Sequence, residues 1–375
     1  MKIKQVTIYH LDMPLIFPFE TSLGLETGRE CLILAAEGGG LTGWGECVAS
    51  DRPSYSYETV GTAWQILEEF LIPAILGLEW SHIPDFLEAI EWVRGHQMAK
   101  AALQCTAWDL ISQSEGISLA TKLGEGYPED PADRVAVGVS IGIQPTINET
   151  ISRIEDFVGQ GFSRVKLKIK PGWDLDLLKA VREIFPALPL MVDANSAYSM
   201  EHADLIRQFD DFNLLMIEQP LAHDDIYQHS QLQSMLQTPI CLDESITTPN
   251  QAEWALVIEA GRIINIKPGR VGGVWESRLI HDLCAARGIP VWCGGMLETG
   301  IGRAANLAVA SLPNFKLPSD NGPTRRYWEE DIVEELFELN PEDSTINVPD
   351  KPGLGITPDL NRIENYLLRK KKIQL

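Results

Sequence analysis

SRVKLKIKPGWD, residues 163–174, is a short apolar run that carries a lysine at every second position. Alternate residues of a β-strand point to the same face, so the side chains of Lys166 and Lys168 are expected side by side, with Lys170 following. Two ammonium groups placed so close repel each other. The run is therefore predicted to be a strand whose last residues belong to a functional site.

Similar apolar runs recur from about residue 135 onward, each ending in polar or glycine residues before a helix-like segment. In chain order they are VAVGVS, RVKLKI, LPLMVDAN, LLMIEQP, PICLDES, IINIKPG, PVWCGGM and FKLPSD. Strands that alternate with helices pair in parallel, and eight units over roughly 190 residues favour a closed barrel over an open sheet. The sequence predicts an α/β fold of the (β/α)8 type, a modified TIM barrel.

Residues 1–127 have a different pattern and predict a separate α+β domain. The strand-like runs KQVTIYHLDMPL, ECLILAAEG and GLTGWGECV come first, and long helix-like segments follow them. Residues 128–327 are then predicted to form the barrel. The remaining residues, 328–375, return to turns and short extended pieces and are predicted to pack back on the first domain.

The composition excludes several classes of partner. The 375 residues include 31 Lys and Arg against 53 Asp and Glu, a formal net charge of −22, which argues against nucleic acid and anionic membranes. The N-terminus alternates like a strand, so no signal peptide is expected, and no run approaches the roughly 18 apolar residues of a membrane span. The six cysteines lack CxxC spacing, which favours a reducing, cytoplasmic setting.

Five charged residues close successive runs of the predicted barrel, each 24 or 25 residues after the previous one. They are Lys168, Asp193, Glu218, Asp243 and Lys267. This interval is the length of one strand-and-helix unit, so the five should stand at similar height around one mouth. Active sites of such barrels lie at the carboxyl ends of the strands. The five residues are therefore the predicted catalytic set.

The three carboxylates of the set predict a metal site, because no basic residue is evident among them in the sequence. Left alone they would repel one another, and a hard divalent cation removes that cost. Oxygen ligands without His or Cys favour Mg²⁺ over Zn²⁺, with Mn²⁺ as a substitute. Glu244 is expected to point away from the site or to lie beyond the strand, in a supporting role. Asn195 is placed to reach a ligand or a metal-bound water.

Lys168 and Lys267 belong to the second and sixth predicted strands, which are diametrically opposed in a ring of eight. A substrate between them would have one amine or ammonium on each face, which suits moving a proton on or off carbon from either side. Free lysine has a pKa of about 10.4, which is high for a base at neutral pH. The charge of Lys166 and a nearby divalent metal are expected to lower the pKa of Lys168.

Taken together, these motifs resemble the enolase superfamily. The resemblance is carried by KLK, VDAN, IEQP, LDES, NIKPGRVGG and WCGGMLETGIGRAAN, together with GWGEC near the N-terminus. Within the superfamily the chain looks most like the o-succinylbenzoate synthase and N-acylamino acid racemase family, of the muconate-lactonizing-enzyme-like subgroup. The resemblance implies a capping domain completed by the C-terminal segment, with Lys168 as base and Lys267 as opposing lysine. The implied Mg²⁺ ligands are Asp193, Glu218 and Asp243.

The resemblance also implies a function, a carbon–oxygen lyase of menaquinone biosynthesis. The expected reaction is the Mg²⁺-dependent syn dehydration of 2-succinyl-6-hydroxy-2,4-cyclohexadiene-1-carboxylate to o-succinylbenzoate, by proton abstraction alpha to a carboxylate. The alternative is racemisation of N-acylated, especially N-succinylated, amino acids, and both activities can occur in one protein. A metal-binding barrel without catalysis is the rival from another class, and the lysine pair argues against it. We further expect a small-molecule carboxylate as partner and a homo-oligomer.

Further residues are candidates with alternatives left open. Phe19 and Tyr55 lie in Pro-rich loops of the first domain, where aromatic residues either pack or close over a substrate. Ser140 ends the first strand and could bond a substrate oxygen or its own backbone. Gly295 and Met296 form either core or pocket wall.

Arg270, three residues after Lys267, either pairs with an acid or helps to lower the pKa of that lysine. The segment SDNGPTRRYW after the last run carries Gly and Pro where the family resemblance implies small hydroxyl residues, so substrate contacts there are left unassigned.

Overall fold

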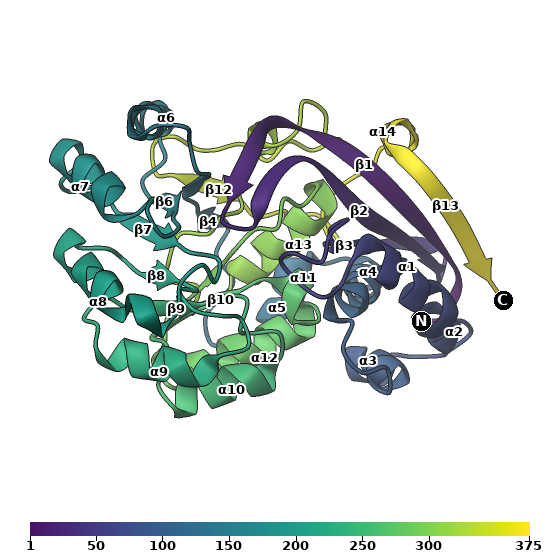
Figure 1. The fold of residues 1–375 in the computed structure, drawn as a ribbon. Helices are drawn as coiled ribbons and strands as arrows, with labels where there is room; N and C mark the ends of the chain where they lie inside the picture. Colours follow the sequence, from purple (N-terminus) through teal and green to yellow (C-terminus); the bar gives the residue numbers. More distant parts are fainter.

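The parallel strands of the predicted barrel form one curled sheet of seven, in the order β11-β10-β9-β8-β7-β6-β5. The computed structural model describes residues 1–375 and shows these strands at the centre of the teal and green half of the molecule (Figure 1). The strands are β5 (Val139–Ile141), β6 (Val165–Lys168), β7 (Leu190–Asp193), β8 (Ile217–Glu218), β9 (Ile240–Leu242), β10 (Ile263–Ile266) and β11 (Val291–Cys293). Their order follows the chain, as the alternation of strands and helices predicts.

The eighth predicted strand, in FKLPSD, does not form. Phe315 makes a single parallel bridge to Val291 of β11, and Ser319 makes one to Val137, just before β5. This segment thus joins the two edges of the sheet through isolated bridges. Pro318 lies within it and has no N–H to donate to a ladder, which accounts for the interruption. Only a 3₁₀ turn, Thr324–Arg326, follows, so the prediction of eight regular strand-and-helix units was wrong at its last unit.

The first predicted run, VAVGVS, is also divided. Its beginning belongs to β4 (Arg134–Ala136), which pairs antiparallel with β12 (Thr345–Asn347) of the C-terminal segment. Gly138 separates β4 from β5, and its N–H donates to Ser319 O at 2.8 Å. The break therefore lets one run contribute to two sheets.

Helices cover the outer face of the parallel sheet (Figure 1). They are α6 (Ile147–Gly159), α7 (Leu175–Ile184), α9 (Ile226–Ser234), α10 (Pro249–Val257), α12 (Val274–Ala285) and α13 (Gly300–Ala310), with the short helical piece α8 (Ala203–Ile206). The short helix α11 (Pro268–Val271) instead follows Lys267 at the strand ends and packs against α4 (Gln97–Glu115). Several of the outer helices begin at a hydroxyl cap, as where Thr146 accepts from the N–H of Glu149 at 3.2 Å. In α7 the apolar residues Leu177, Leu178 and Val181 face inward.

The second sheet is antiparallel, in the order β13-β1-β2-β3, and unites the two ends of the chain. Its strands are β1 (Ile3–Thr21), β2 (Gly24–Gly38), β3 (Leu41–Cys47) and β13 (Leu367–Gln374). In Figure 1 the purple β1 and β2 run beside the yellow β13. The C-terminal segment therefore completes the N-terminal sheet. The hairpin of β1 and β2 extends toward the barrel.

The helices that accompany this sheet are α1 (Val60–Ile66), α2 (Ile72–Ile75), α3 (Ile83–Glu91), α4 (Gln97–Glu115), α5 (Leu119–Gly124) and α14 (Leu360–Asn365), and a π-helical stretch at Leu67–Leu71 joins the first two. Helix α4 is buried along most of its length. Its Asp109 accepts from the N–H groups of Trp44 and Leu354, both at 2.8 Å, and burial raises the pKa of this carboxyl to about 6. The helix thus ties β3 to the C-terminal segment.

One hydrophobic core of 91 buried residues runs through the cap and the barrel. A second cluster lies among the barrel strands and contains Met191, Met216, Cys241, Ile263 and Trp292. All six cysteines are buried and unpaired. No helix of the structure combines the length and the apolar character that a membrane crossing requires.

Gly45→Ala should destabilise the protein by about 3 kcal/mol, because β3 and α4 pack backbone to backbone at this position. A Cβ on Gly45 would lie 2.0 Å from Ala102 O, so the helix or the strand must move. Gly61→Ala is the matched control, since its Cβ would meet only Thr59 Oγ1 at 3.7 Å. Chemical denaturation measures the free energy of unfolding of both variants. Equal stability of the two variants would contradict the tight packing of α4 on β3.

Candidate active site

The ends of β6 to β10 bring the five predicted catalytic residues together. Lys168 and Asp193 are partners in the register of β6 and β7, and Asp193 and Glu218 are partners in that of β7 and β8. Asp243 and Lys267 follow the last residues of β9 and β10 directly. All five side chains are buried. Regular spacing along the chain has therefore become proximity at one edge of the sheet.

Each of the two lysines contacts a different carboxylate. Lys168 Nζ lies 2.6 Å from Asp193 Oδ2 and donates to Asn195 Oδ1 at 2.7 Å. Lys267 Nζ lies 2.8 Å from Asp243 Oδ2. Strands β7, β8 and β9 stand between the strands that carry the lysines. The two amines therefore approach the mouth from separate parts of the sheet.

Lys166 lies among the acids, so the expectation that no basic residue accompanies the carboxylates was wrong. Its Nζ lies 2.5 Å from Asp320 Oδ2, 3.0 Å from Glu218 Oε2 and 3.3 Å from Asp193 Oδ2. A lysine on β6 that faces the barrel interior is long enough to reach the neighbouring strand ends. Burial lowers the pKa of Lys166, but these carboxylates outweigh burial and raise it overall. The positive charge of Lys166 is thus balanced by neighbouring carboxylates, whereas the sequence predicted mainly repulsion between Lys166 and Lys168.

Asp320 is a site residue that the sequence analysis missed. It lies at the end of the interrupted eighth segment and also pairs with Arg164, at 2.8 Å between Arg164 Nη1 and Asp320 Oδ1. Burial raises the pKa of Asp320, but the charges of Lys166 and Arg164 hold it well below its ordinary value. Asp320 is the last residue of the run FKLPSD, and an acid in this position could have predicted a site residue from the sequence. Ser140 Oγ donates to Asp320 Oδ2 at 3.0 Å rather than to its own backbone, and its contact with a substrate oxygen stays a prediction.

Asn195 connects Lys168 to Glu244. Its Nδ2 donates to Glu244 Oε1 at 2.8 Å, and its backbone N–H donates to Asp193 Oδ1 at 3.0 Å. Glu244 therefore lies beyond the strand and turns toward the site, which decides between the two expected placements. Its other oxygen, Oε2, is buried without a hydrogen-bond partner. Burial, with the charge of Asp193 next, raises the pKa of Glu244 to about 7.

Glu218 has a second partner that was missed, Asn265. Asn265 Nδ2 donates to Glu218 Oε1 at 2.7 Å, while its Oδ1 accepts from the N–H of Gly294 at 2.7 Å. Asn265 stands two residues before Lys267 on β10, so the alternation of a strand could have placed it on the inner face. It links β8, β10 and the end of β11.

Arg270 pairs with Asp243, the first of its two expected roles. Its guanidinium also donates to the carbonyls of Ile246, at 2.8 Å, and Asn265, at 2.6 Å. Tyr55 OH donates to Asp243 Oδ1 at 3.2 Å and accepts from Lys267 Nζ at 3.0 Å. Asp243 is therefore surrounded by three donors.

The three predicted metal ligands are neighbours at the strand ends, but in this arrangement no group of three His, Cys, Asp or Glu side chains is spaced to hold a metal ion. Each carboxylate turns instead toward a lysine or arginine. The donor set still fits a hard cation, because it consists of buried carboxylate oxygens at the ends of three successive strands. The orphaned oxygen of Glu244 adds a fourth acidic group nearby. A cation would replace charges that the ammonium groups now supply.

The predicted substrate contacts line one cavity of about 150 Å³ that also contains Lys166, Lys168 and Lys267. They are Phe19, Tyr55, Ser140, Gly295 and Met296. Lys168 Nζ lies 5.9 Å from the centre of the Phe19 ring, and Lys267 Nζ lies 4.8 Å from that of Tyr55. The two loop aromatics of the first domain thus reach the lysines of the barrel, which favours closure over the site rather than packing elsewhere.

Comparison with known proteins matches both parts of the chain. Residues 3–124 match the family model of the mandelate racemase / muconate lactonizing enzyme N-terminal domain, and residues 149–362 match the enolase C-terminal domain-like model. An o-succinylbenzoate synthase of Geobacillus kaustophilus is 48% identical over 98% of this chain and 96% of its own length. An N-succinylamino acid racemase of Thermus thermophilus is 45% identical over 98% of both chains. A solved structure from Listeria innocua, described as a member of the enolase superfamily, has a TM-score of 0.94 and 38% identity over 100% of this chain and 99% of its own.

Proposed function

Because this chain belongs to the mandelate racemase / muconate lactonizing enzyme family of the enolase superfamily, we propose that it removes a proton alpha to a carboxylate. The leading reaction is the syn dehydration of 2-succinyl-6-hydroxy-2,4-cyclohexadiene-1-carboxylate to o-succinylbenzoate. The observation that carries the proposal is the pair of buried lysines, Lys168 and Lys267, in one cavity at the ends of β6 and β10. The similarity to an o-succinylbenzoate synthase over nearly the whole chain supports this choice.

In this reaction Lys168, as the free amine, takes the proton from carbon. It then returns a proton to the departing hydroxyl, which leaves as water while the ring becomes aromatic. Lys267, as the ammonium, stabilises the negative charge that develops on the substrate carboxylate. Asn195 holds the Lys168 side chain through its 2.7 Å contact, and Tyr55 does the same for Lys267 at 3.0 Å. The positions of both lysines are thus set by neighbours on other elements.

Asp193, Glu218 and Asp243 would hold Mg²⁺, with Mn²⁺ as a substitute, and Glu244 and Arg270 support this set. Bound there, the cation would supply positive charge that makes the proton alpha to a carboxylate easier to remove. Lys166 is proposed to balance the acids through its contacts with Glu218 and Asp320, 3.0 and 2.5 Å away.

Racemisation of N-succinylamino acids is the second candidate, favoured by the separate placement of the two lysines. Each contacts its own carboxylate, Asp193 for Lys168 and Asp243 for Lys267, so either can exchange a proton independently. One lysine would remove the alpha proton from one face, and the other would deliver a proton to the opposite face. The similarity to an N-succinylamino acid racemase supports this reaction as well. We propose that one protein performs both.

Several features complete the proposal. Residues 1–127 act as the cap, residues 128–327 carry the catalytic groups, and residues 328–375 complete the cap. The enzyme acts in menaquinone biosynthesis on a small-molecule carboxylate, as a homo-oligomer. The buried, unpaired cysteines support a reducing compartment such as the cytoplasm.

Phe19→Ala should raise KM for the acyl substrate about tenfold while proton exchange at the alpha carbon continues, since loss of one well-packed ring contact is worth about 1.4 kcal/mol. Phe19 lines the catalytic cavity beside Lys168, so its ring is placed to cover a bound substrate. Phe70→Ala is the control, because this ring is 39% exposed on the cap and lines neither cavity near the site. Steady-state kinetics on several acyl substrates measure both variants. Unchanged KM for every substrate would show that Phe19 only packs.

The proposed function is tested by assaying the purified protein with Mg²⁺ on both substrates. Dehydration is followed by the appearance of o-succinylbenzoate, and racemisation by exchange of the alpha proton for deuterium. We expect dehydration and expect exchange with N-succinylamino acids. Absence of both reactions in a folded, Mg²⁺-loaded protein would refute the proposal.

A further inference from the structure

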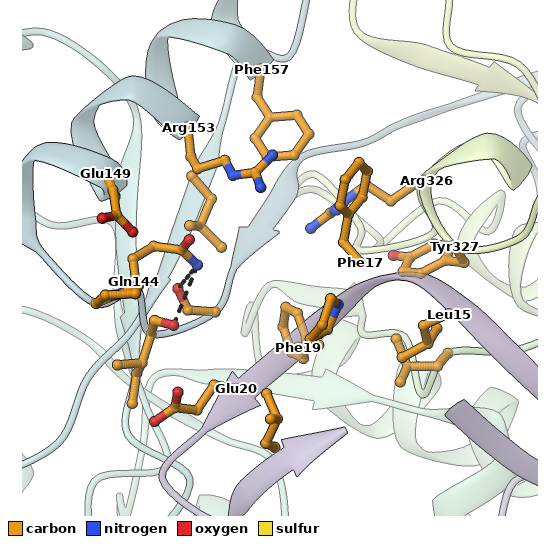
Figure 2. Close-up of a pocket in the computed structure, with 17 residues that line it drawn as sticks. Leu15, Phe17, Phe19, Glu20, Gln144, Glu149, Arg153, Phe157, Arg326 and Tyr327 are labelled. Carbon is orange, nitrogen blue, oxygen red and sulfur yellow. Dashed lines mark hydrogen bonds between the residues drawn. The ribbon is translucent and has the colours of Figure 1, made fainter. Parts of the chain in front are cut away.

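A second cavity, of about 360 Å³, adjoins the catalytic one. It lies between the tip of the β1 and β2 hairpin, the loop after β5, helix α6 and the turn at Arg326 (Figure 2). Phe19, Leu297, Arg326 and Tyr327 line both cavities. The two cavities therefore meet at these four side chains.

Two arginines enter the second cavity from opposite sides. Figure 2 shows the side chains of Arg153, from α6, and Arg326 extending toward each other near Phe17. Arg153 Cζ lies 5.1 Å from the centre of the Phe17 ring, and Arg326 Cζ lies 4.6 Å from that of Phe157. The aromatic rings orient the guanidinium groups. The Arg153 guanidinium makes no hydrogen bond and Arg326 uses only Nη2, so the other N–H groups are available to an anion.

Neither guanidinium has an acidic partner. The acids that line this cavity are Glu20 and Glu149. Glu20 pairs with Lys170, at 3.5 Å, and Glu149 makes no ion pair. The hydrogen bond of Arg326 goes to the carbonyl of Ser140, at 2.5 Å. Two positive charges thus share a cavity whose other lining residues are mostly apolar.

This arrangement carries an energetic cost that an anion would remove. Burial lowers the pKa of Arg326 overall, and the charge of Arg153 acts in the same direction, while Tyr327 and Asp320 offset part of this effect. A guanidinium that is partly removed from water without a counter-charge is unfavourable. A carboxylate can accept two parallel hydrogen bonds from one guanidinium, which makes it a suitable occupant.

We infer that Arg153 and Arg326 form a subsite for the terminal carboxylate of the succinyl group, with Leu15, Phe19 and Leu25 around its methylene chain. The inference rests on the proposed function and adds to it the residues that select a charged acyl chain. Both proposed substrates carry this carboxylate at the end opposite the reacting carbon. Arg326 stands where the two cavities meet, so it would contact the carboxylate from the catalytic side and Arg153 from the outer side.

The test compares binding of two ligands to the Mg²⁺-loaded protein by isothermal titration calorimetry. One is o-succinylbenzoate, and the other is its derivative in which the succinyl carboxylate is a neutral primary amide. Arg153→Gln and Arg326→Gln are the test variants, and Arg325→Gln is the matched control because this neighbouring arginine is exposed and lines neither cavity. The side chain of Arg153 makes no hydrogen bond, so its variant should remain folded.

Wild type should bind the diacid at least about tenfold more tightly than the amide, as expected for a charge-assisted bidentate contact. Each test variant should lose most of this preference, and Arg325→Gln should keep it. An equal affinity of wild type for both ligands, or a full preference in either test variant, would overturn the subsite. Turnover is assayed in parallel. The wild-type protein could prefer the diacid, and both variants lose that preference, while the wild type catalyses neither reaction. That result would refute the proposed reactions and still support the subsite.

Discussion

Lys168→Ala is expected to abolish exchange of the alpha proton from one enantiomer of an N-succinylamino acid, and Lys267→Ala from the other. The lysines end β6 and β10, with three strands between them, and each contacts its own carboxylate. A substrate between them presents opposite faces of its alpha carbon to the two amines. Loss of one positioned base lowers exchange from its face by about 10³-fold, while the other face keeps its base.

Racemisation needs both lysines, so it should be lost in both variants. Dehydration should also fall steeply in each, for different reasons. Lys168→Ala loses the base, whereas Lys267→Ala loses the ammonium that stabilises developing charge.

The measurement is deuterium incorporation by NMR on each pure enantiomer. Lys170→Ala is the matched control, since this lysine follows in the same run but is 42% exposed and pairs with Glu20. It should exchange both enantiomers as wild type does. If one catalytic-lysine variant retained exchange of both enantiomers, the two-faced site would be refuted.

Removal of divalent cations should reduce both activities on the order of 10³-fold, because metal assistance supplies several kcal/mol of charge stabilisation. Mg²⁺ or Mn²⁺ should restore them. The reason lies in the donor set, in which Asp193, Glu218 and Asp243 are buried carboxylates at the ends of successive strands. Full activity after exhaustive EDTA treatment would contradict the metal site. Rescue by Zn²⁺ alone would contradict the argument from oxygen ligands.

Asp243→Asn tests the same site without a chelator. It should weaken Mg²⁺ binding and lower activity while the protein stays folded, as followed by calorimetry and circular dichroism. Glu253→Gln on α10 is the control, because it removes a charge from an exposed acid whose nearest contact with Arg287 is 3.8 Å. It should change neither Mg²⁺ binding nor activity. Mg²⁺ affinity equal to wild type in Asp243→Asn would remove this residue from the proposed ligands.

Much of the site could be predicted from the sequence because it depends on regular geometry. An interval of 24 or 25 residues between Lys168, Asp193, Glu218, Asp243 and Lys267 equals one strand-and-helix unit. Parallel strands end at one edge of a sheet, so equal spacing along the chain becomes equal height in space. The antiparallel sheet of the first domain followed from alternation of the same simple kind.

Other features depended on the tertiary structure. The eighth strand was predicted from its apolar residues, yet only folding shows that Pro318 leaves single bridges there. The partners of Lys166 could not be predicted, because Asp320 and Glu218 are distant in the chain and meet it only inside the barrel. The neighbours of Arg326 are likewise set by the packing of α6 and the cap hairpin against the last segment.

The sequence alone therefore determined that Lys168, Asp193, Glu218, Asp243 and Lys267 stand at the mouth of the barrel, since strand and helix periodicity sets their height and face. The tertiary structure decided which charges pair and which stay without a partner. Ion pairing depends on distances of a few ångströms between side chains from separate elements, and local periodicity does not encode those distances. For this reason the positions of Lys168 and Lys267 could be predicted from the sequence, whereas the pairing of Arg153 with Arg326 in the second cavity depends on the tertiary structure.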